Sequence, residues 1–169
     1  RSVTIDATEN EESFKNFTRQ KRYRLMWMDT KYEPGEVKVV AYNDAGEVAE
    51  EKVIRTAGKP HHLELVADRT TLTADGRDIA FVTVRVVDKE GNLIPDDARL
   101  LTFRVTGAAT FRAAASGNPA SLDAFHLPRH HAFSGQLVTL VQSSEQSGEA
   151  VLHVSAKGLP TATLRLQIK

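Results

Sequence analysis

The chain has 169 residues, in which 22 Lys and Arg side chains balance 22 Asp and Glu, and it contains no cysteine. At this length it can bury one good core or two small ones, but it is too short for a (β/α)8 catalytic barrel, which needs about 250 residues. The balanced charge creates no global field to gather nucleic acid or anionic lipid, and the lack of cysteine excludes disulfides and thiolate metal sites.

The first half of the chain predicts a small β module. Residues 1–21 are polar and indicate no packed unit of their own, whereas residues 22–57 alternate apolar and polar side chains with the period of half-buried strands. The alternating apolar positions are Tyr23, Leu25 and Trp27 in one run and Val37, Val39 and Ala41 in the next. The run stops before Gly58-Lys59-Pro60, where we place a domain boundary, so that the first domain covers 1–58.

From residue 61 onward, strands and turns follow one another at the spacing of a sandwich of about seven short strands. The predicted strands cover 62–67, 79–87, 99–105, 109–114, 136–142, 149–155 and 161–168. Three alternating sets are expected to face inward: Ala80, Val82, Val84 and Val86; Leu101, Phe103 and Val105; and Ala162, Leu164, Leu166 and Ile168. The sequence thus predicts an all-β chain whose second domain covers 59–169.

The connection over residues 113–135 is too long for a hairpin turn, and it is the one predicted loop with room for a function. Zinc takes three or four N, O or S ligands, so the histidines of the chain are candidates. They are His61, His62, His126, His130, His131 and His153. His126 and His130 would chelate a metal only on a helix, which Pro128 disfavours, and we therefore expect local hydrogen bonding instead.

A possible calcium loop is suggested by Asp88, Glu90 and Asn92, which have the 1, 3, 5 spacing of such loops. An EF-hand needs glycine at the sixth position, and here that residue is leucine. A hairpin turn is therefore the better interpretation. A calcium site of another kind, which joins Asp88 to Asp96 or Asp97, is kept as an alternative.

Retaining glycosidases hold two carboxyl groups about 5 to 5.5 Å apart, so we considered the adjacent acidic pairs. They are Glu11-Glu12, Glu50-Glu51 and Asp96-Asp97. Adjacent residues on a strand point to opposite faces, which makes these pairs surface charges rather than catalytic groups. The aromatic residues Tyr23, Trp27 and Tyr42 are interpreted mainly as packing groups, while Tyr32, beside the turn at 33–35, is the best candidate for a carbohydrate contact.

Several segments resemble one family of enzymes. Residues 23–42, followed by Arg55-Thr56-Ala57-Gly58, resemble the Ig-like module that follows the catalytic barrel in many glycoside hydrolase family 2 β-galactosidases. Residues 72–95 resemble the bacterial Ig-like repeat that these enzymes share with invasin-type adhesins. Three further segments are similar to the terminal module of the same hydrolases: Gly117-Asn118-Pro119-Ala120-Ser121, Ala132-Phe133-Ser134-Gly135 and Val141-Gln142-Ser143.

The resemblance covers about residues 22–169 and implies two immunoglobulin-like β-sandwich modules, of which the first is truncated because Arg1 would fall inside it. It implies a non-catalytic accessory region of an exported bacterial β-galactosidase, periplasmic or at the cell surface, with the catalytic barrel as its partner. The barrel's two catalytic glutamates have no counterpart here, and no metal or cofactor is expected. A carbohydrate-binding module and an Ig-like spacer of a surface adhesin are the alternatives, and self-association through the first domain is a further expectation.

Overall fold

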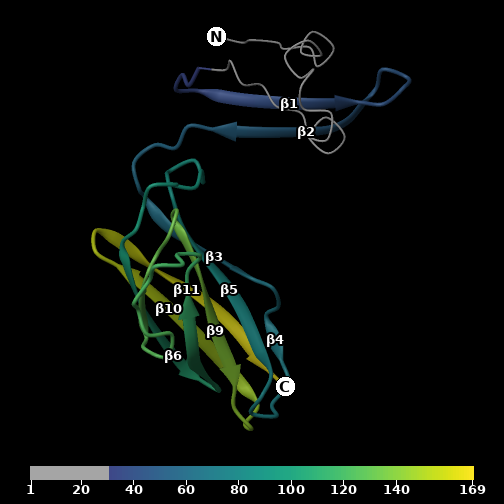
Figure 1. The fold of residues 1–169 in the computed structure, drawn as a ribbon. Helices are drawn as coiled ribbons and strands as arrows, with labels where there is room; N and C mark the ends of the chain where they lie inside the picture. Colours follow the sequence, from purple (N-terminus) through teal and green to yellow (C-terminus); the bar gives the residue numbers. More distant parts are fainter. Residues whose placement is uncertain (1–30) are drawn as a thin grey trace. The chain divides into compact units, whose positions relative to one another are not determined.

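The structure, a computed structural model, describes residues 31–169, and every regular element in that range is a β-strand (Figure 1). This confirms the all-β prediction. Strands β1 (Glu36–Tyr42) and β2 (Val48–Arg55) form an antiparallel two-stranded sheet. The turn between them is held by Asn43, whose side-chain oxygen accepts hydrogen bonds from the backbone N–H groups of Ala45 and Glu47. The expected strand around residues 23–27 lies outside the described residues.

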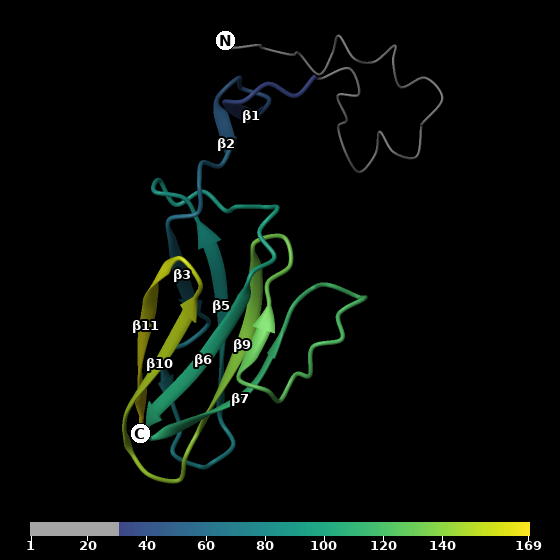
Figure 2. The same ribbon diagram turned by 90° about the vertical axis from the view of Figure 1, so that its left-hand side faces the viewer.

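The remaining strands form a sandwich of two sheets (Figures 1 and 2). One sheet has the order β3 (His62–Ala67), β5 (Ile79–Val87), β9 (Gln136–Ser143) and β7 (Ala109–Ala115). The other has the order β4 (Thr71–Leu72), β11 (Leu159–Ile168), β10 (Gly148–Ala156), β6 (Leu100–Gly107) and β8 (Arg129–His131). All pairs are antiparallel except β11 with β4.

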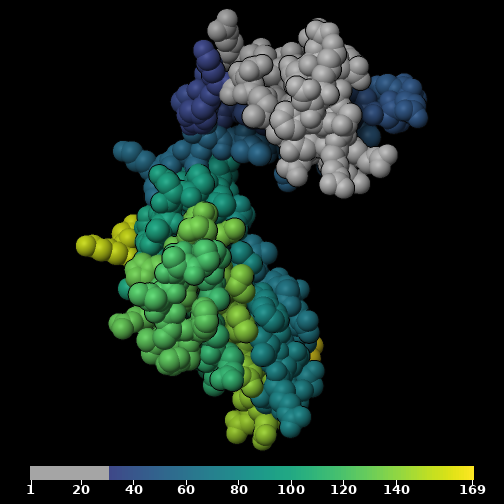
Figure 3. Space-filling model, in the orientation of Figure 1, coloured from purple at the N-terminus to yellow at the C-terminus, as the bar shows by residue number. Residues whose placement is uncertain are grey.

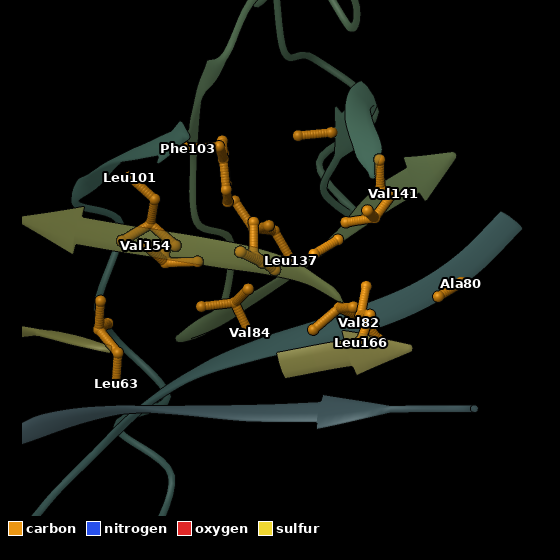
Figure 4. Close-up of a cluster of buried hydrophobic side chains, with 14 of the residues drawn as sticks. Leu63, Ala80, Val82, Val84, Leu101, Phe103, Leu137, Val141, Val154 and Leu166 are labelled. Carbon is orange, nitrogen blue, oxygen red and sulfur yellow. The ribbon is translucent and has the colours of Figure 1, made fainter. Parts of the chain in front are cut away.

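The core lies between the two sheets, where their alternating apolar side chains meet (Figure 4). The four predicted inward residues of β5, Ala80 to Val86, are fully buried, as are Leu101 in β6 and Ile168 in β11. Val105, Ala162 and Leu164 are half-buried and pack against the same cluster. The period-two pattern therefore identified the inner faces correctly, because only one side of each strand escapes water.

Two short strands were not predicted. β8 lies inside the segment 113–135 that the sequence indicated as a loop, and its fully buried position is occupied by His130 rather than by an apolar residue. β4 has only two residues, too few to show any period. The seven predicted strands of the sandwich are all present and end within two residues of their expected bounds. The domain boundary near Gly58-Lys59-Pro60 stays a prediction.

Candidate functional site

The segment between β7 and β8 forms one wall of an open groove of about 570 Å³, which we call the Phe125 groove. Its floor is the outward surface of β5, β7 and β9, and its wall is residues 123–126. The lining residues are Ile79, Arg112, Ala113, Asp123, Ala124, Phe125, His126 and Leu140. Figure 2 shows the chain leaving the sandwich after β7 before it returns as β8, and in Figure 3 the same green segment forms a raised surface.

The wall is fixed by backbone hydrogen bonds to both sheets. The Ala114 N–H in β7 donates to the Phe125 carbonyl over 2.9 Å, so the wall covers the otherwise free edge of the four-stranded sheet. The Phe103 N–H in β6 donates to the Pro128 carbonyl, also over 2.9 Å. Between these anchors the Asn118 side-chain oxygen accepts the Ala120 N–H and its backbone carbonyl accepts the Ser121 N–H, which gives the segment a defined course.

The charges of the groove differ in how they are paired. The Asp123 carboxylate accepts the backbone N–H of His131 and a bond from its Nδ1, each over 2.8 Å. Both bonds lower the pKa of Asp123 below its usual value, and the backbone bond has the larger effect. Asp123 is therefore ionised at neutral pH. Arg112 is exposed and makes no hydrogen bond or ion pair with any residue of the described range 31–169. The groove thus offers an uncommitted cation beside an apolar floor.

Behind the wall lies the buried ring of His130. Its Nδ1 is 3.0 Å from the His131 carbonyl, which can only accept, so Nδ1 carries the proton. Its Nε2 is buried and has no hydrogen-bond partner among residues 31–169. The ring stacks on Phe125, with centroids 6.1 Å apart and planes at 6°. His130 therefore supports the exposed Phe125 ring from beneath, a role that the sequence did not indicate.

The histidines proposed as metal ligands are distributed over the fold. His61 and His62 contact each other, His126 lies in the groove wall, and His153 is on β10. Among residues 31–169, no three His, Asp or Glu side chains lie close enough together to hold a metal ion. The local hydrogen bonds of His130 and His131 agree with the interpretation given from the sequence.

Asp88 organises a turn, as the preferred interpretation proposed. Its side-chain oxygens accept the backbone N–H groups of Gly58, Glu90 and Asn92 and the side-chain amide of Asn92. The bonds from Gly58 and Asn92 lower the pKa of Asp88 from 3.8 to about 2. Asp97, one of the two proposed calcium partners of Asp88, is instead held by Arg99, at 2.6 Å for the shortest contact. Both carboxylates are thus occupied by N–H donors.

The aromatic candidates for sugar binding are only partly within the described residues. Tyr32 is 77% exposed, next to the bend at Pro34 and Gly35, and its role as a carbohydrate contact stays a prediction. Tyr42 is also exposed, at the end of β1, in contrast to the packing role expected for it. β1 belongs to a two-stranded sheet and not to the sandwich, so among the described residues no second sheet covers its side chains, which explains the difference. Tyr23 and Trp27, like Glu11-Glu12, lie outside the described residues, while Glu50 and Glu51 are surface charges on β2.

Comparison with known proteins gives the family. Residues 63–165, most of the sandwich, match the family described as glycoside hydrolase family 2 C-terminal domain 5. The chain belongs to glycoside hydrolase family 2. Residues 6–49 match a domain of unknown function. The region matched consists of C-terminal, non-catalytic domains of this family, as the resemblance implied, and the adhesin spacer is no longer needed as an alternative.

Relatives within the family support this assignment. The chain is 43% identical over 136 residues to the β-galactosidase BoGH2A of Bacteroides ovatus and 28% identical over 128 residues to a β-galactosidase of Thermoanaerobacter pseudethanolicus. These matches cover 80% and 76% of the chain but only 16% and 15% of the relatives. A family 2 glycosyl hydrolase from Bacteroides cellulosilyticus has the same fold, with a TM-score of 0.78 at 30% identity, over 83% of this chain and 18% of that one. The chain spans about a sixth of the length of its relatives.

Proposed function

We propose that the chain is the non-catalytic C-terminal region of a β-galactosidase that hydrolyses terminal β-galactosides with retention of configuration. The observation that carries the proposal is the 43% identity to a β-galactosidase over 80% of the chain. Because the match covers only 16% of this relative, the reacting carboxylates would belong to a barrel outside this chain.

The described residues support an accessory role by their chemistry. Acidic side chains with fixed positions include Asp88, Asp97 and Asp123, and each of these is held by backbone or side-chain N–H groups. A retaining glycosidase instead needs one carboxyl group free to attack and a second that exchanges a proton. These three carboxylates stabilise turns and the groove wall.

The test is an assay of two polypeptides on chromogenic substrates. The full-length polypeptide that contains this chain is expected to hydrolyse a β-galactoside in preference to the matching β-glucoside and β-glucuronide. The purified 169-residue chain is expected to give no turnover above a buffer control. Preference for another glycoside would contradict the proposed substrate, and turnover by the purified chain alone would contradict the accessory role.

Export to the periplasm or cell surface is part of the same proposal, taken from the resemblance. No helix within residues 31–169 is long and apolar enough to cross a membrane. Fractionation of cells that produce the full-length polypeptide, with a cytoplasmic and a periplasmic marker enzyme, tests the compartment. Recovery with the cytoplasmic marker would contradict this part of the proposal and leave the substrate assignment untouched.

A second candidate, the carbohydrate-binding module, is favoured by the exposed Phe125 ring in an open groove that also presents Arg112 and Asp123. Aromatic faces suit the apolar surfaces of sugar rings, and charged groups bond their hydroxyls. Calorimetric titration of the chain with galactosides and plant polysaccharides tests it. Binding that is lost in Phe125→Ala and kept in Phe133→Ala, another exposed phenylalanine, would establish a sugar site at the groove.

A further inference from the structure

The two outer faces of the sandwich differ in composition. On the five-stranded sheet, cross-strand neighbours Arg104, His153 and Thr163 form a polar row over β6, β10 and β11. On the four-stranded sheet, the corresponding row over β5, β9 and β7 is Phe81, Leu140 and Ala113. An antiparallel sheet that faces water on its outer side is expected to carry polar residues there. In the two rows compared, only the five-stranded sheet follows that rule.

The apolar row continues mainly on one side, where the next row over β3, β5, β9 and β7 is Val66, Thr83, Val138 and Ala115. On the other side Ile79 extends it along β5, beside the polar neighbours Gln142 and Thr110. Phe81 and Val66 are each 49% exposed. We call these residues, together with the adjoining Phe125 groove, the outer apolar face. Contiguous exposed apolar surface of this kind on a soluble domain marks an interaction site.

The face also carries a charge that has no partner in the described part of the chain. Arg112, at the groove, makes no hydrogen bond or ion pair within residues 31–169, while the Arg85–Glu64 pair at the other end of the sheet is closed at 2.6 Å. An apolar surface with one uncommitted guanidinium at its rim is complementary to an apolar partner surface flanked by a carboxylate.

We propose that the outer apolar face is the docking surface for the catalytic part of the same polypeptide. The inference rests on the proposed function, since the relatives extend over about six times the length that this chain covers, which supplies a tethered partner. A tethered surface is present at high effective concentration, so a face of moderate area is sufficient for stable docking. The docked partner would cover Phe81 and Phe125 and place a carboxylate against Arg112.

The experiment uses the absence of cysteine from this chain. Three variants of the full-length polypeptide each carry one introduced thiol: Phe81→Cys and Phe125→Cys on the outer apolar face, and Arg104→Cys on the polar face as control. The rate of maleimide labelling at each introduced thiol is measured by peptide mass spectrometry. It is divided by the rate for the same variant unfolded in urea, which removes differences in intrinsic reactivity.

Docking predicts labelling at positions 81 and 125 that is at least tenfold slower than at position 104. Equal labelling at all three positions would overturn the proposal. Equal protection at position 104 would also overturn it, because the protection would then not be specific to the outer apolar face. Protection that disappears on dilution would assign the face to a second copy instead. Protection that appears only when a galactoside is added would assign it to sugar.

The readout is independent of catalysis. Full-length polypeptide that hydrolyses no β-galactoside but shows the selective protection would refute the proposed substrate and keep the docking surface. Full-length polypeptide that hydrolyses a β-galactoside but has equally reactive thiols at the three positions would refute the docking surface and keep the proposed substrate. A charge reversal, Arg112→Glu, gives a second measurement: if docking places a carboxylate there, labelling at position 81 is expected to become several-fold faster, whereas Arg104→Glu leaves it unchanged.

Discussion

Gly107 and Gly158 have nearly the same backbone conformation but very different surroundings. Their φ angles are +87° and +79°, a region that residues with a Cβ seldom adopt. A Cβ on Gly107 would lie 2.1 Å from the Glu149 carbonyl oxygen, whereas a Cβ on Gly158 would have no atom within 4 Å. The pair therefore separates the cost of the backbone conformation from the cost of a steric clash.

We expect Gly158→Ala to lower the free energy of unfolding by about 1 kcal/mol, because only the left-handed conformation opposes it. Gly107→Ala is expected to cost about 1–3 kcal/mol more, since the Glu149 carbonyl accepts the Ala108 N–H and cannot move away freely. Urea unfolding followed by far-UV circular dichroism measures both. Equal losses within about 0.5 kcal/mol would show that β10 shifts to accommodate the methyl group.

The Asp88 carboxylate predicts a specific pH dependence. Its pKa in the folded chain is about 2, below the ordinary value of 3.8, so its contribution to stability is complete above that ordinary value. The contribution is lost as the pH falls toward about 2 and the carboxylate is protonated. Asp88→Asn places an amide against the Gly58 N–H, and this variant is expected to be less stable at neutral pH.

The difference between wild type and Asp88→Asn is expected to narrow between about pH 4 and about pH 2. Urea midpoints measured across that range check it. Asp96→Asn is the control, because Asp96 is exposed and accepts no hydrogen bond from residues 31–169. A constant difference at every pH would mean that Asp88 acts through shape and not through its charge.

At the scale of elements, the strands of the sandwich were predictable because each buries one side only. The β5 sequence alternates Ala80 to Val86 inward with Phe81 to Arg85 outward, so period two alone located the strand and its inner face. β8 escaped prediction because its inward residue is His130, a polar ring that is tolerated there through its bond to the His131 carbonyl and its contact with Phe125. The groove could not be predicted from the sequence either, for a different reason. Its floor comes from three strands whose adjacency is set by the sheet order, which no local pattern encodes.

Substitutions at two leucines, one buried and one exposed, test which elements contribute side chains to the core. Leu152 in β10 is 0% exposed, while Leu122 in the segment between β7 and β8 is 100% exposed. In the 169-residue chain, Leu152→Ala is expected to lower the free energy of unfolding by about 2–5 kcal/mol, because it leaves a cavity between the sheets. Leu122→Ala is expected to change it by less than about 0.5 kcal/mol. The same urea experiment measures both, and a large loss for Leu122→Ala would show that this side chain packs in solution.

At the scale of the whole chain, the described sheets differ in how much they bury. The sandwich surrounds its core with two sheets, whereas β1 and β2 form a two-stranded sheet with an apolar side that is largely exposed, including Val37 at 58% and Ile54 at 65%. An isolated pair of strands is marginal in water. The sequence-based prediction is that the first domain is incomplete and that another surface or a second copy covers its apolar side. The exposed apolar side chains of β1 and β2 are the reason for it.

Amide exchange by mass spectrometry of the monomeric 169-residue chain measures this difference. We expect the backbone N–H groups of β1 and β2 to exchange at least about a hundredfold faster than those of β5 and β11, because a small opening exposes a hairpin while the inner strands exchange only when the sandwich opens. The edge strand β3 serves as the internal control, since it shares the sandwich core but lies at the border of its sheet. Its exchange should resemble that of β5 at the N–H groups bonded to β5. Protection of β1 and β2 equal to that of β5 at every protein concentration would mean that the first domain has a complete core of its own, and the prediction of a truncated module would then be wrong.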